Sequence, residues 1–203
     1  DDFHHSANVA IRGKREAYFH DYTGTAQELV SLVKWGYLYQ GQYYAWQEKV
    51  RGTPVLAKAA TCFISFLQNH DQVANSGFGK RLHQHIHPGD MRAMTALLLL
   101  APQTPLLFQG QEFGASAPFL FFADHAPELA ASVEIGRTEF LSQFPSLHSA
   151  LSVAYIHRPE SRKTFDRCKL DFSEREHHAA IYQLHQDLLA LRRQDPVFSD
   201  PYH

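Results

Sequence analysis

The spacing of apolar and polar residues predicts four helices, over residues 25–40, 90–101, 128–144 and 173–193. The first and the last open on capping-box patterns, Thr25-Ala26-Gln27-Glu28 and Ser173-Glu174-Arg175-Glu176, and carry apolar side chains on one face. The second ends before Pro102, because proline lacks the backbone donor that a helix needs. The apolar face of the last helix is expected to pack on a larger body.

Two apolar runs without helical spacing predict strands between these helices. Residues 61–67 are interpreted as a strand buried on both faces, and residues 105–108 as a second, shorter strand. The alternating order of helices and strands predicts parallel strands joined by right-handed crossovers. The fold class expected is therefore α/β, with a sheet that two or three strands cannot close.

Composition and charge narrow the classes of function. With 203 residues and 44% hydrophobic composition, the chain can form one sizeable core, and a net charge of −2 argues against nucleic acid as a partner. The longest apolar run, residues 96–101, is far shorter than the roughly 20 residues of a membrane helix, so no membrane partner is expected. Cys62 and Cys168 are expected to be reduced thiols, which favours a cytoplasmic location.

Both ends of the sequence suggest part of a longer protein. The chain opens on Asp1-Asp2-Phe3-His4-His5 without an initiating Met, and a proline-containing run, residues 195–201, follows the last helix. We expect residues 1–203 to be a fragment, with another domain beginning near or beyond residue 196.

The polar run Asn69-His70-Asp71-Gln72 directly follows the first predicted strand. Parallel-sheet enzymes carry their catalytic groups at the C-terminal ends of strands. A carboxylate such as Asp71 can stabilise the positive charge that develops on a sugar ring, and His70 can hydrogen-bond hydroxyl groups. A structural role in a loop stays open, because such short triplets also arise by chance.

The second predicted strand leads to a polar, glycine-containing segment with Glu112. We interpret Glu112 as structural or substrate-orienting, since nothing pairs it with a second carboxylate. The aromatic run that follows includes Phe119, whose ring could stack against a sugar face. The opening residues Asp2, His4 and His5 could hydrogen-bond a polyhydroxyl ligand.

The run His83-Gln84-His85-Ile86-His87 places three imidazoles at alternate positions. In an extended segment they would share one face and could contact a transition metal. A solvated loop is the simpler interpretation, because only Asp90 nearby could complete a ligand set. No metal is expected.

Several ordered segments resemble the malto-oligosyltrehalose trehalohydrolases, a family of the α-amylase superfamily. The resemblance covers nearly the whole chain and implies the C-terminal part of a (β/α)8 TIM barrel, from about the end of strand 6 through helix 8 and without the first five to six strands. Its segments are residues 1–5 and 13–22 after the sixth strand, 66–72 at the seventh, 104–125 at the eighth, and 136–137 and 164–170 downstream.

The resemblance implies hydrolysis, with retention and without a cofactor, of the α-1,4-glucosidic bond next to the terminal trehalose of a malto-oligosaccharide. It makes Asp71 the transition-state stabiliser, with His70 holding hydroxyl groups. The family's nucleophilic Asp and acid/base Glu would precede Asp1, so residues 1–203 alone should be inactive. The residues expected to bind substrate are Asp2, His4, His5, Tyr18, Trp46, Asn69, Gln72, Glu112 and Phe119.

Two departures from the family pattern concern individual sugar contacts. Residues 47–52 replace a more basic run that contains a His-Gly pair, and Asn8 stands where a histidine is common. Three alternatives stay open: another α-amylase-superfamily enzyme of the isoamylase or branching type, a non-catalytic glucan-binding remnant, and a metal-dependent hydrolase.

Overall fold

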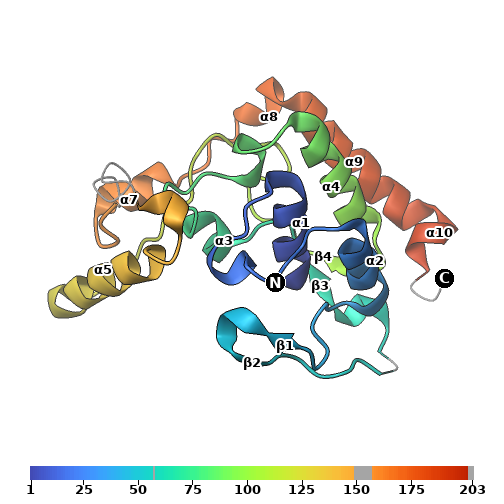
Figure 1. Cartoon of the computed structure of the whole chain (residues 1–203). Helices are drawn as coiled ribbons and strands as arrows, with labels where there is room; N and C mark the ends of the chain where they lie inside the picture. The colour runs from blue at the N-terminus through green and yellow to red at the C-terminus, as the bar shows by residue number, and fades with distance from the viewer. Residues whose placement is uncertain (57, 149–156, 201–203) are drawn as a thin grey trace.

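The structure is a computed structural model that describes residues 1–56, 58–148 and 157–200. This part of the chain is rich in helices, and its strands are two residues long (Figure 1). The α-helices are α1 (Asp2–Arg12), α2 (Ala26–Trp35), α3 (His70–Ala74), α4 (Pro88–Leu100), α5 (Pro127–Leu141), α7 (Arg162–Arg167), α8 (Glu174–His177), α9 (Ala179–Gln194) and α10 (Pro196–Ser199). The 3-10 helices are η1 (Ala17–Phe19), η2 (Ala45–Gln47), η3 (Ala60–Cys62), η4 (Leu82–Gln84) and η5 (Pro145–Leu147), and the strands are β1 (Tyr43–Tyr44), β2 (Lys49–Val50), β3 (Ile64–Ser65) and β4 (Thr104–Pro105).

The strands form two separate pairs. β3 and β4 pair in parallel, with Ile64 opposite Thr104 and Ser65 opposite Pro105, and α3 and α4 lie between them in the sequence. This pairing confirms the predicted parallel strands with a helical connection. β1 and β2 form an antiparallel hairpin, which the sequence analysis did not predict.

The first predicted strand is shorter than expected and is not buried on both faces. The 3-10 helix η3 replaces its beginning, and Cys62 is exposed. Side chains alternate across a strand, and only one face of β3 is covered: Ser65 is 3% exposed, whereas Ile64 is 59% exposed. The prediction was wrong because an apolar run does not show whether both of its faces have a neighbour.

The first predicted helix begins where expected and ends early. The Thr25 hydroxyl accepts a hydrogen bond from the Glu28 amide, at 3.3 Å, which confirms the cap. The helix ends at Trp35, five residues before the predicted end, because Gly36 adopts a φ of +85°. A Cβ on Gly36 would lie 2.5 Å from the Phe63 ring, so glycine also allows the close approach of these segments.

The last predicted helix is interrupted. It divides at His178 into α8 and α9, and the His178 Nδ1 donates to the Phe113 carbonyl oxygen at 2.9 Å. Ser173 does not cap it, because its hydroxyl donates to the Asp171 carboxylate at 2.7 Å. The predicted helices over residues 90–101 and 128–144 are confirmed as α4 and α5, with small shifts of their ends.

The C-terminal helices cover one side of α4. α9 runs beside α4 in Figure 1. The Arg192 guanidinium donates to the carbonyl oxygen of Leu99, in the last turn of α4, and to those of Ala101 and Gln103 beyond it. The last predicted helix thus packs against another helix of the same chain. The predicted exit at residues 195–201 begins with the single turn of α10, and Pro201 lies outside the described residues.

The main core joins α1, α2 and α4 to the segment after β3. Its buried side chains include Phe3, Leu32, Leu67 and Leu98. Within the described ranges, no helix combines the length and the apolar character needed to span a membrane.

Candidate active site

Asp71 and His70 lie after β3, in the first turn of α3. Asn69 caps this helix, because its side-chain oxygen accepts a hydrogen bond from the Gln72 amide at 2.9 Å. The His70 Nε2 lies 3.4 Å from the Asp71 Oδ1, and the two side chains are 66% and 65% exposed. Both groups are therefore accessible to a ligand in this structure.

Tyr18 connects η1 to α3. Its hydroxyl donates to the Gln72 side-chain oxygen at 2.9 Å and lies 3.4 Å from the Asn75 Nδ2. Arg137 in α5 donates to the Asn75 side-chain oxygen at 2.6 Å and to the Ala74 carbonyl oxygen at 2.8 Å. Hydrogen bonds therefore join three separate segments of the chain beside Asp71.

Arg137 and Tyr18 in this network are partly shielded from water. Burial, as the main cause, lowers the pKa of Arg137 to about 10, and the negative charge of Asp71 partly opposes this shift. Burial likewise raises the pKa of Tyr18 above its already high ordinary value, so its hydroxyl is protonated at neutral pH. A cation and a hydrogen-bond donor thus lie close to the candidate catalytic carboxylate.

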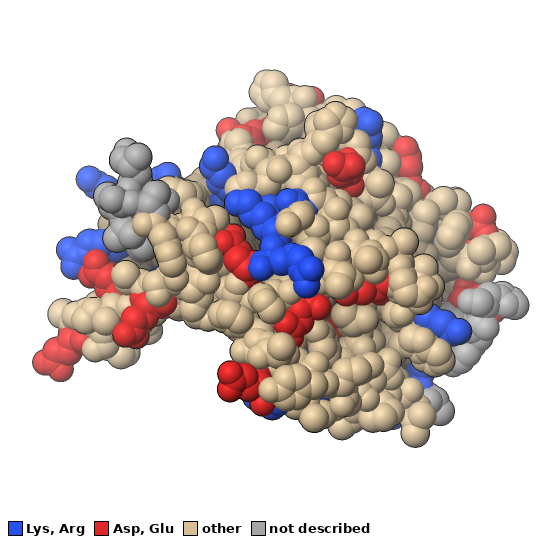
Figure 2. Space-filling model, viewed as in Figure 1, with Lys and Arg blue, Asp and Glu red and all other residues tan. Residues whose placement is uncertain are grey.

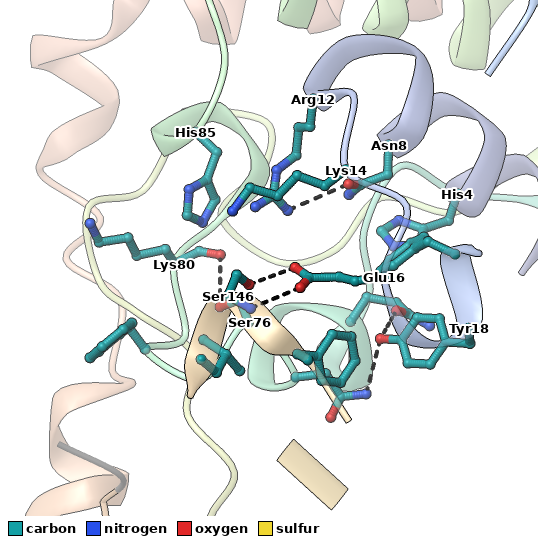
Figure 3. Close-up of a pocket in the computed structure, with 16 residues that line it drawn as sticks. His4, Asn8, Arg12, Lys14, Glu16, Tyr18, Ser76, Lys80, His85 and Ser146 are labelled. Atoms are coloured by element: carbon teal, nitrogen blue, oxygen red, sulfur yellow. Dashed lines mark hydrogen bonds between the residues drawn. The ribbon is translucent and has the colours of Figure 1, made fainter. Parts of the chain in front are cut away.

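A cavity of about 270 Å³ opens beside this network and is called the first cavity (Figure 3). Figure 3 shows Arg12, Lys14 and Lys80 around this cavity, with the Lys80 ammonium group pointing away from Glu16. The Glu16 carboxylate accepts hydrogen bonds from the amide and hydroxyl of Ser146, at 2.9 and 2.5 Å. The other lining residues are His4, Asn8, Tyr18, Phe19, Gln72, Asn75, Ser76, Phe78, His85, Phe144 and Leu147.

Polar and aromatic groups of this kind can hold a hydroxyl-rich ligand. Arg, Lys, Asn and Gln side chains donate hydrogen bonds to hydroxyl oxygens, and aromatic rings cover apolar faces. The volume lies just below the range usual for small-molecule sites. On the face shown in Figure 2, Lys and Arg side chains gather near the middle of the molecule, with acidic side chains beside them.

His4 and His5 are buried in α1, at 3% and 4% exposure. The His4 Nδ1 donates to the Leu67 carbonyl oxygen at 2.5 Å, and the ring lines the first cavity. The His5 ring stacks on Tyr18 with their centroids 5.0 Å apart, and its two nitrogens have no hydrogen-bond partner among the described residues. Burial, the main cause, lowers the pKa of His4 to about 4 and that of His5 to about 2.

Asp2 is bound by groups of the chain itself. Its carboxylate accepts hydrogen bonds from the Tyr22 hydroxyl and from the Leu38 and Tyr39 amides, at 2.7, 3.0 and 3.2 Å. It also pairs with Arg51 at 3.1 Å. Asp2 therefore joins several segments of the chain through polar contacts, and its contact with substrate stays a prediction.

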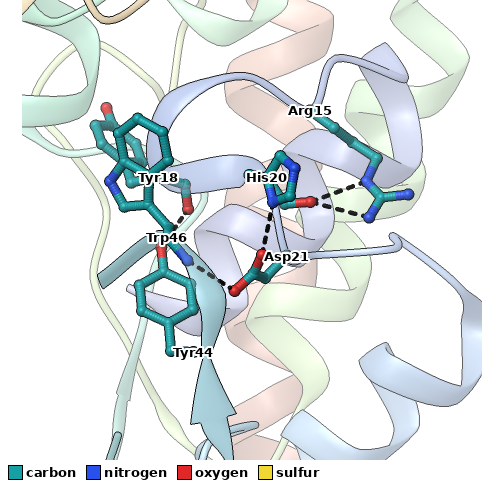
Figure 4. Close-up of polar contacts among 6 residues, drawn as sticks. All are labelled: Arg15, Tyr18, His20, Asp21, Tyr44 and Trp46. Carbon is teal, nitrogen blue, oxygen red and sulfur yellow. Dashed lines mark hydrogen bonds and ion pairs between the residues drawn. The ribbon is translucent and has the colours of Figure 1, made fainter. Parts of the chain in front are cut away.

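Trp46 lies on the exposed hairpin and is 40% exposed. Its amide donates to the Asp21 carboxylate at 3.1 Å, and the Tyr44 hydroxyl donates to the Tyr18 carbonyl oxygen at 2.7 Å (Figure 4). His20 also contacts Asp21, at 2.7 Å. These bonds hold the hairpin against the segment that carries Tyr18, and the substrate contacts expected of Tyr18 and Trp46 stay predictions.

Glu112 and Phe119 lie in the segment after β4 and have different surroundings. Arg81, which is fully buried, donates to the Gln109 and Ala117 carbonyl oxygens, each at 2.7 Å. Burial, as the main cause, lowers the pKa of Arg81, and the negative charge of Glu112 partly opposes this shift. The Phe119 ring packs edge-on against Phe108 and Phe122. Within the described part of the chain, no hydrogen bond, ion pair or ring contact joins Glu112 or Phe119 to Asp71. Their roles in binding substrate therefore stay predictions.

The histidine run does not share one face. His83 lies in the 3-10 helix η4 and His85 directly follows it, and the two rings line different cavities. The His87 Nδ1 accepts a hydrogen bond from the Gly89 amide at 3.1 Å. The condition for a shared face, an extended segment, is not met because the segment coils. The described ranges contain no group of three or more His, Cys, Asp or Glu residues arranged to hold a metal ion.

Sequence reasoning missed several residues of the first cavity. Arg12, Lys14 and Lys80 were not among the predicted site residues, and the sequence did not link Glu16 to Ser146. The basic run of residues 12–15, directly after a helix, was the one local signal. The Glu16–Ser146 contact joins positions 130 residues apart, which no local pattern indicates.

Known proteins that match the sequence agree on one family. The chain is 43% identical, over 97% of its length, to a malto-oligosyltrehalose trehalohydrolase of Deinococcus radiodurans, and 34% identical over its whole length to one of Mycobacterium tuberculosis. The chain belongs to the malto-oligosyltrehalose trehalohydrolase family. It spans about a third of the length of these relatives, 33% and 35% respectively. No family model matches the sequence.

A solved structure with a similar fold agrees with this family assignment. A Salmonella typhimurium protein assigned as an α-amylase matches 97% of this chain with a TM-score of 0.86 and 32% identity, and the match covers 33% of that protein. The trehalohydrolase family and this amylase-like neighbour are glycosidase-type enzymes. A fragment of a TIM barrel is consistent with both findings.

Proposed function

We propose that this chain is the C-terminal part of a (β/α)8 barrel in a retaining trehalohydrolase. The complete enzyme would hydrolyse the α-1,4-glucosidic bond next to the terminal trehalose of a malto-oligosaccharide and release trehalose. The observation that carries this proposal is the exposed His70–Asp71 pair after β3, beside Tyr18 and the first cavity. The names of the relatives support the choice of substrate.

In this proposal Asp71 acts on the transition state. Glycoside hydrolysis develops positive charge on the sugar ring, and a fixed carboxylate stabilises that charge more than it stabilises the neutral substrate. His70 hydrogen-bonds a hydroxyl group of the same sugar. Arg137, near Asp71, restrains the end of α3 through Asn75 and Ala74 and so keeps the carboxylate in place.

The remaining chemistry needs two further carboxyl groups, about 5 Å apart, one as nucleophile and one as acid/base. We assign both to segments of the complete protein outside residues 1–203. These residues alone would then lack activity, and the reaction would need no metal or organic cofactor. The sugar units would contact the first cavity through His4, Tyr18 and Gln72, which line it.

A second candidate is an α-amylase-type hydrolase that acts on glucan without a trehalose end, which the Salmonella neighbour favours. Product analysis separates the two candidates. The complete protein is incubated with maltotriosyltrehalose and, in parallel, with maltopentaose, and the sugars released are separated by chromatography. We expect trehalose from the first substrate and little cleavage of the second. Equal cleavage of both, without free trehalose, would support the amylase-type activity instead.

A further inference from the structure

A second cavity, of about 200 Å³, lies between α4 and α9. It shares no lining residue with the first cavity. Met91, Ile181 and Leu184 form apolar walls. Gly114, at a φ of +62°, keeps it open, because a Cβ there would lie 3.1 Å from the Ile181 Cδ1. The second cavity is thus separate from the proposed site of hydrolysis.

Three polar side chains line the second cavity with buried atoms that have no partner among the described residues. They are the Gln111 Nε2 and Oε1, the His185 Nε2 and the His83 Nδ1. Gln111 and His185 are 1% and 3% exposed, so bulk water does not satisfy them. A buried polar atom without a partner is costly, and proteins rarely leave several together. Their convergence on one cavity indicates a hydrogen-bonding guest.

The protonation of these groups defines the guest. The His185 Nδ1 donates to the Ile181 carbonyl oxygen at 2.9 Å, so the Nε2 of the neutral ring is an acceptor. Gln111 offers both a donor and an acceptor. Burial, as the main cause, lowers the pKa of His83 to about 4, so the His83 ring is neutral at pH 7. The guest must therefore donate at least one hydrogen bond. These three groups require no charge on it, and Arg92, the one Lys or Arg side chain in the lining, is exposed to solvent.

The size and walls restrict the guest further. An apolar cavity of about 150 Å³ accepts a benzene molecule, so the second cavity suits roughly one six-membered ring with small substituents. A glucose unit would turn several hydroxyl groups toward Met91, Ile181 and Leu184, where they would find no partner. The lining contains no Phe, Tyr or Trp to cover a sugar face.

We propose that the second cavity binds an uncharged cyclic alcohol with two neighbouring hydroxyl groups. Its ring packs against Met91, Ile181 and Leu184, one hydroxyl donates to the His185 Nε2, and the other exchanges hydrogen bonds with the Gln111 amide.

The probe for this proposal is cis-cyclohexane-1,2-diol, with the complete protein labelled with ¹⁵N at histidine. Titration should shift the His185 ring resonances saturably and leave those of His4, in the first cavity, unchanged. Glucose and benzene, which lack either the apolar ring or the hydroxyl groups, should bind at least about tenfold more weakly. A crystal soaked in the diol should show it between α4 and α9. Ordered waters alone, or unmoved His185 resonances, would overturn the proposal.

Two substitutions distinguish the second cavity from adventitious binding. Gln111→Leu removes the amide and should weaken the diol about tenfold, while Leu184→Phe should fill the cavity and abolish binding. Gln183→Leu is the matched control, because Gln183 is exposed on the same helix and, among the described residues, its side chain bonds only to Asp187. Unchanged affinity in the folded Gln111→Leu and Leu184→Phe proteins would contradict the assignment. The binding readout is independent of glycosidase activity.

Discussion

At the scale of single residues, buried polar groups in α1 organise the N-terminal part of the chain. Asp2 is 4% exposed and connects Tyr22, Leu38, Tyr39 and Arg51 through one carboxylate. A buried carboxylate is tolerated only when such partners replace water. The position that the sequence suggested as a sugar contact therefore has a clear structural role.

We predict that Asp2→Asn lowers the free energy of unfolding by about 1–3 kcal/mol, because the amide nitrogen cannot accept the bonds that one carboxylate oxygen now accepts. Denaturant unfolding of the complete protein measures the change. Asp124→Asn is the control, since Asp124 is exposed in the segment after β4. Equal stability of the two variants would show that the Asp2 contacts contribute nothing.

The buried histidines of α1 predict a loss of stability in acid. The ordinary pKa of histidine is 6.5, and burial lowers the pKa to about 4 for His4 and about 2 for His5. Below pH 6.5 the unfolded chain binds protons that the folded chain rejects. Each ring should therefore cost about 1.4 kcal/mol of stability per pH unit as the pH falls from 6.5 to 4, and nothing above 6.5.

Denaturant unfolding at a series of pH values tests this dependence. His5→Phe keeps an aromatic ring beside Tyr18. It should reduce the loss of stability between pH 6.5 and 4 to the part that His4 contributes. A slope identical to that of the unsubstituted protein would mean that His5 is protonated equally in both states.

At the scale of elements, local signals predicted the beginnings of helices better than their ends. The capping pattern at Thr25 needs only neighbouring residues, and the helix begins there. Its end depends on Gly36 meeting Phe63, 27 positions away, which the sequence does not indicate. The same reason explains β3: the exposure of Ile64 depends on which segments reach that face.

Thr25→Ala should destabilise the protein by about 1 kcal/mol, because the first turn of α2 loses a hydrogen-bond acceptor. Thermal unfolding of the complete protein measures the effect. Thr138→Ala, within α5, is the control: among the described residues the Thr138 hydroxyl bonds only to the Glu134 carbonyl oxygen, and alanine favours helix. A larger loss from Thr138→Ala would contradict the assigned cap.

At the scale of the whole molecule, the candidate site depends on contacts between distant segments. The position of Asp71 after a strand was predictable from the local run, whereas the bond between Tyr18 and Gln72 joins residues 54 positions apart. Arg137 reaches the same place from α5. The sequence could therefore indicate the position of the carboxylate, but not the network that surrounds it.

The proposed partial barrel predicts poor stability for residues 1–203 alone. Leu56, Val50 and Ile64 are 79%, 64% and 59% exposed, and the remaining strands would cover surface of this kind. We expect a broad thermal transition for the isolated chain and a cooperative one for the complete protein in calorimetry. A sharp, cooperative transition of the isolated monomer would contradict a partial barrel.

The most direct test of the central claim is trehalose release from maltotriosyltrehalose by the complete protein carrying Asp71→Asn. Because the Asp71 side chain is 65% exposed, this change should leave the melting temperature unaltered. We predict that kcat falls at least about hundredfold, since the transition state loses a stabilising charge, while Asp124→Asn keeps the normal rate. A folded Asp71→Asn protein with a near-normal kcat would contradict the assignment of Asp71 as the stabilising carboxylate.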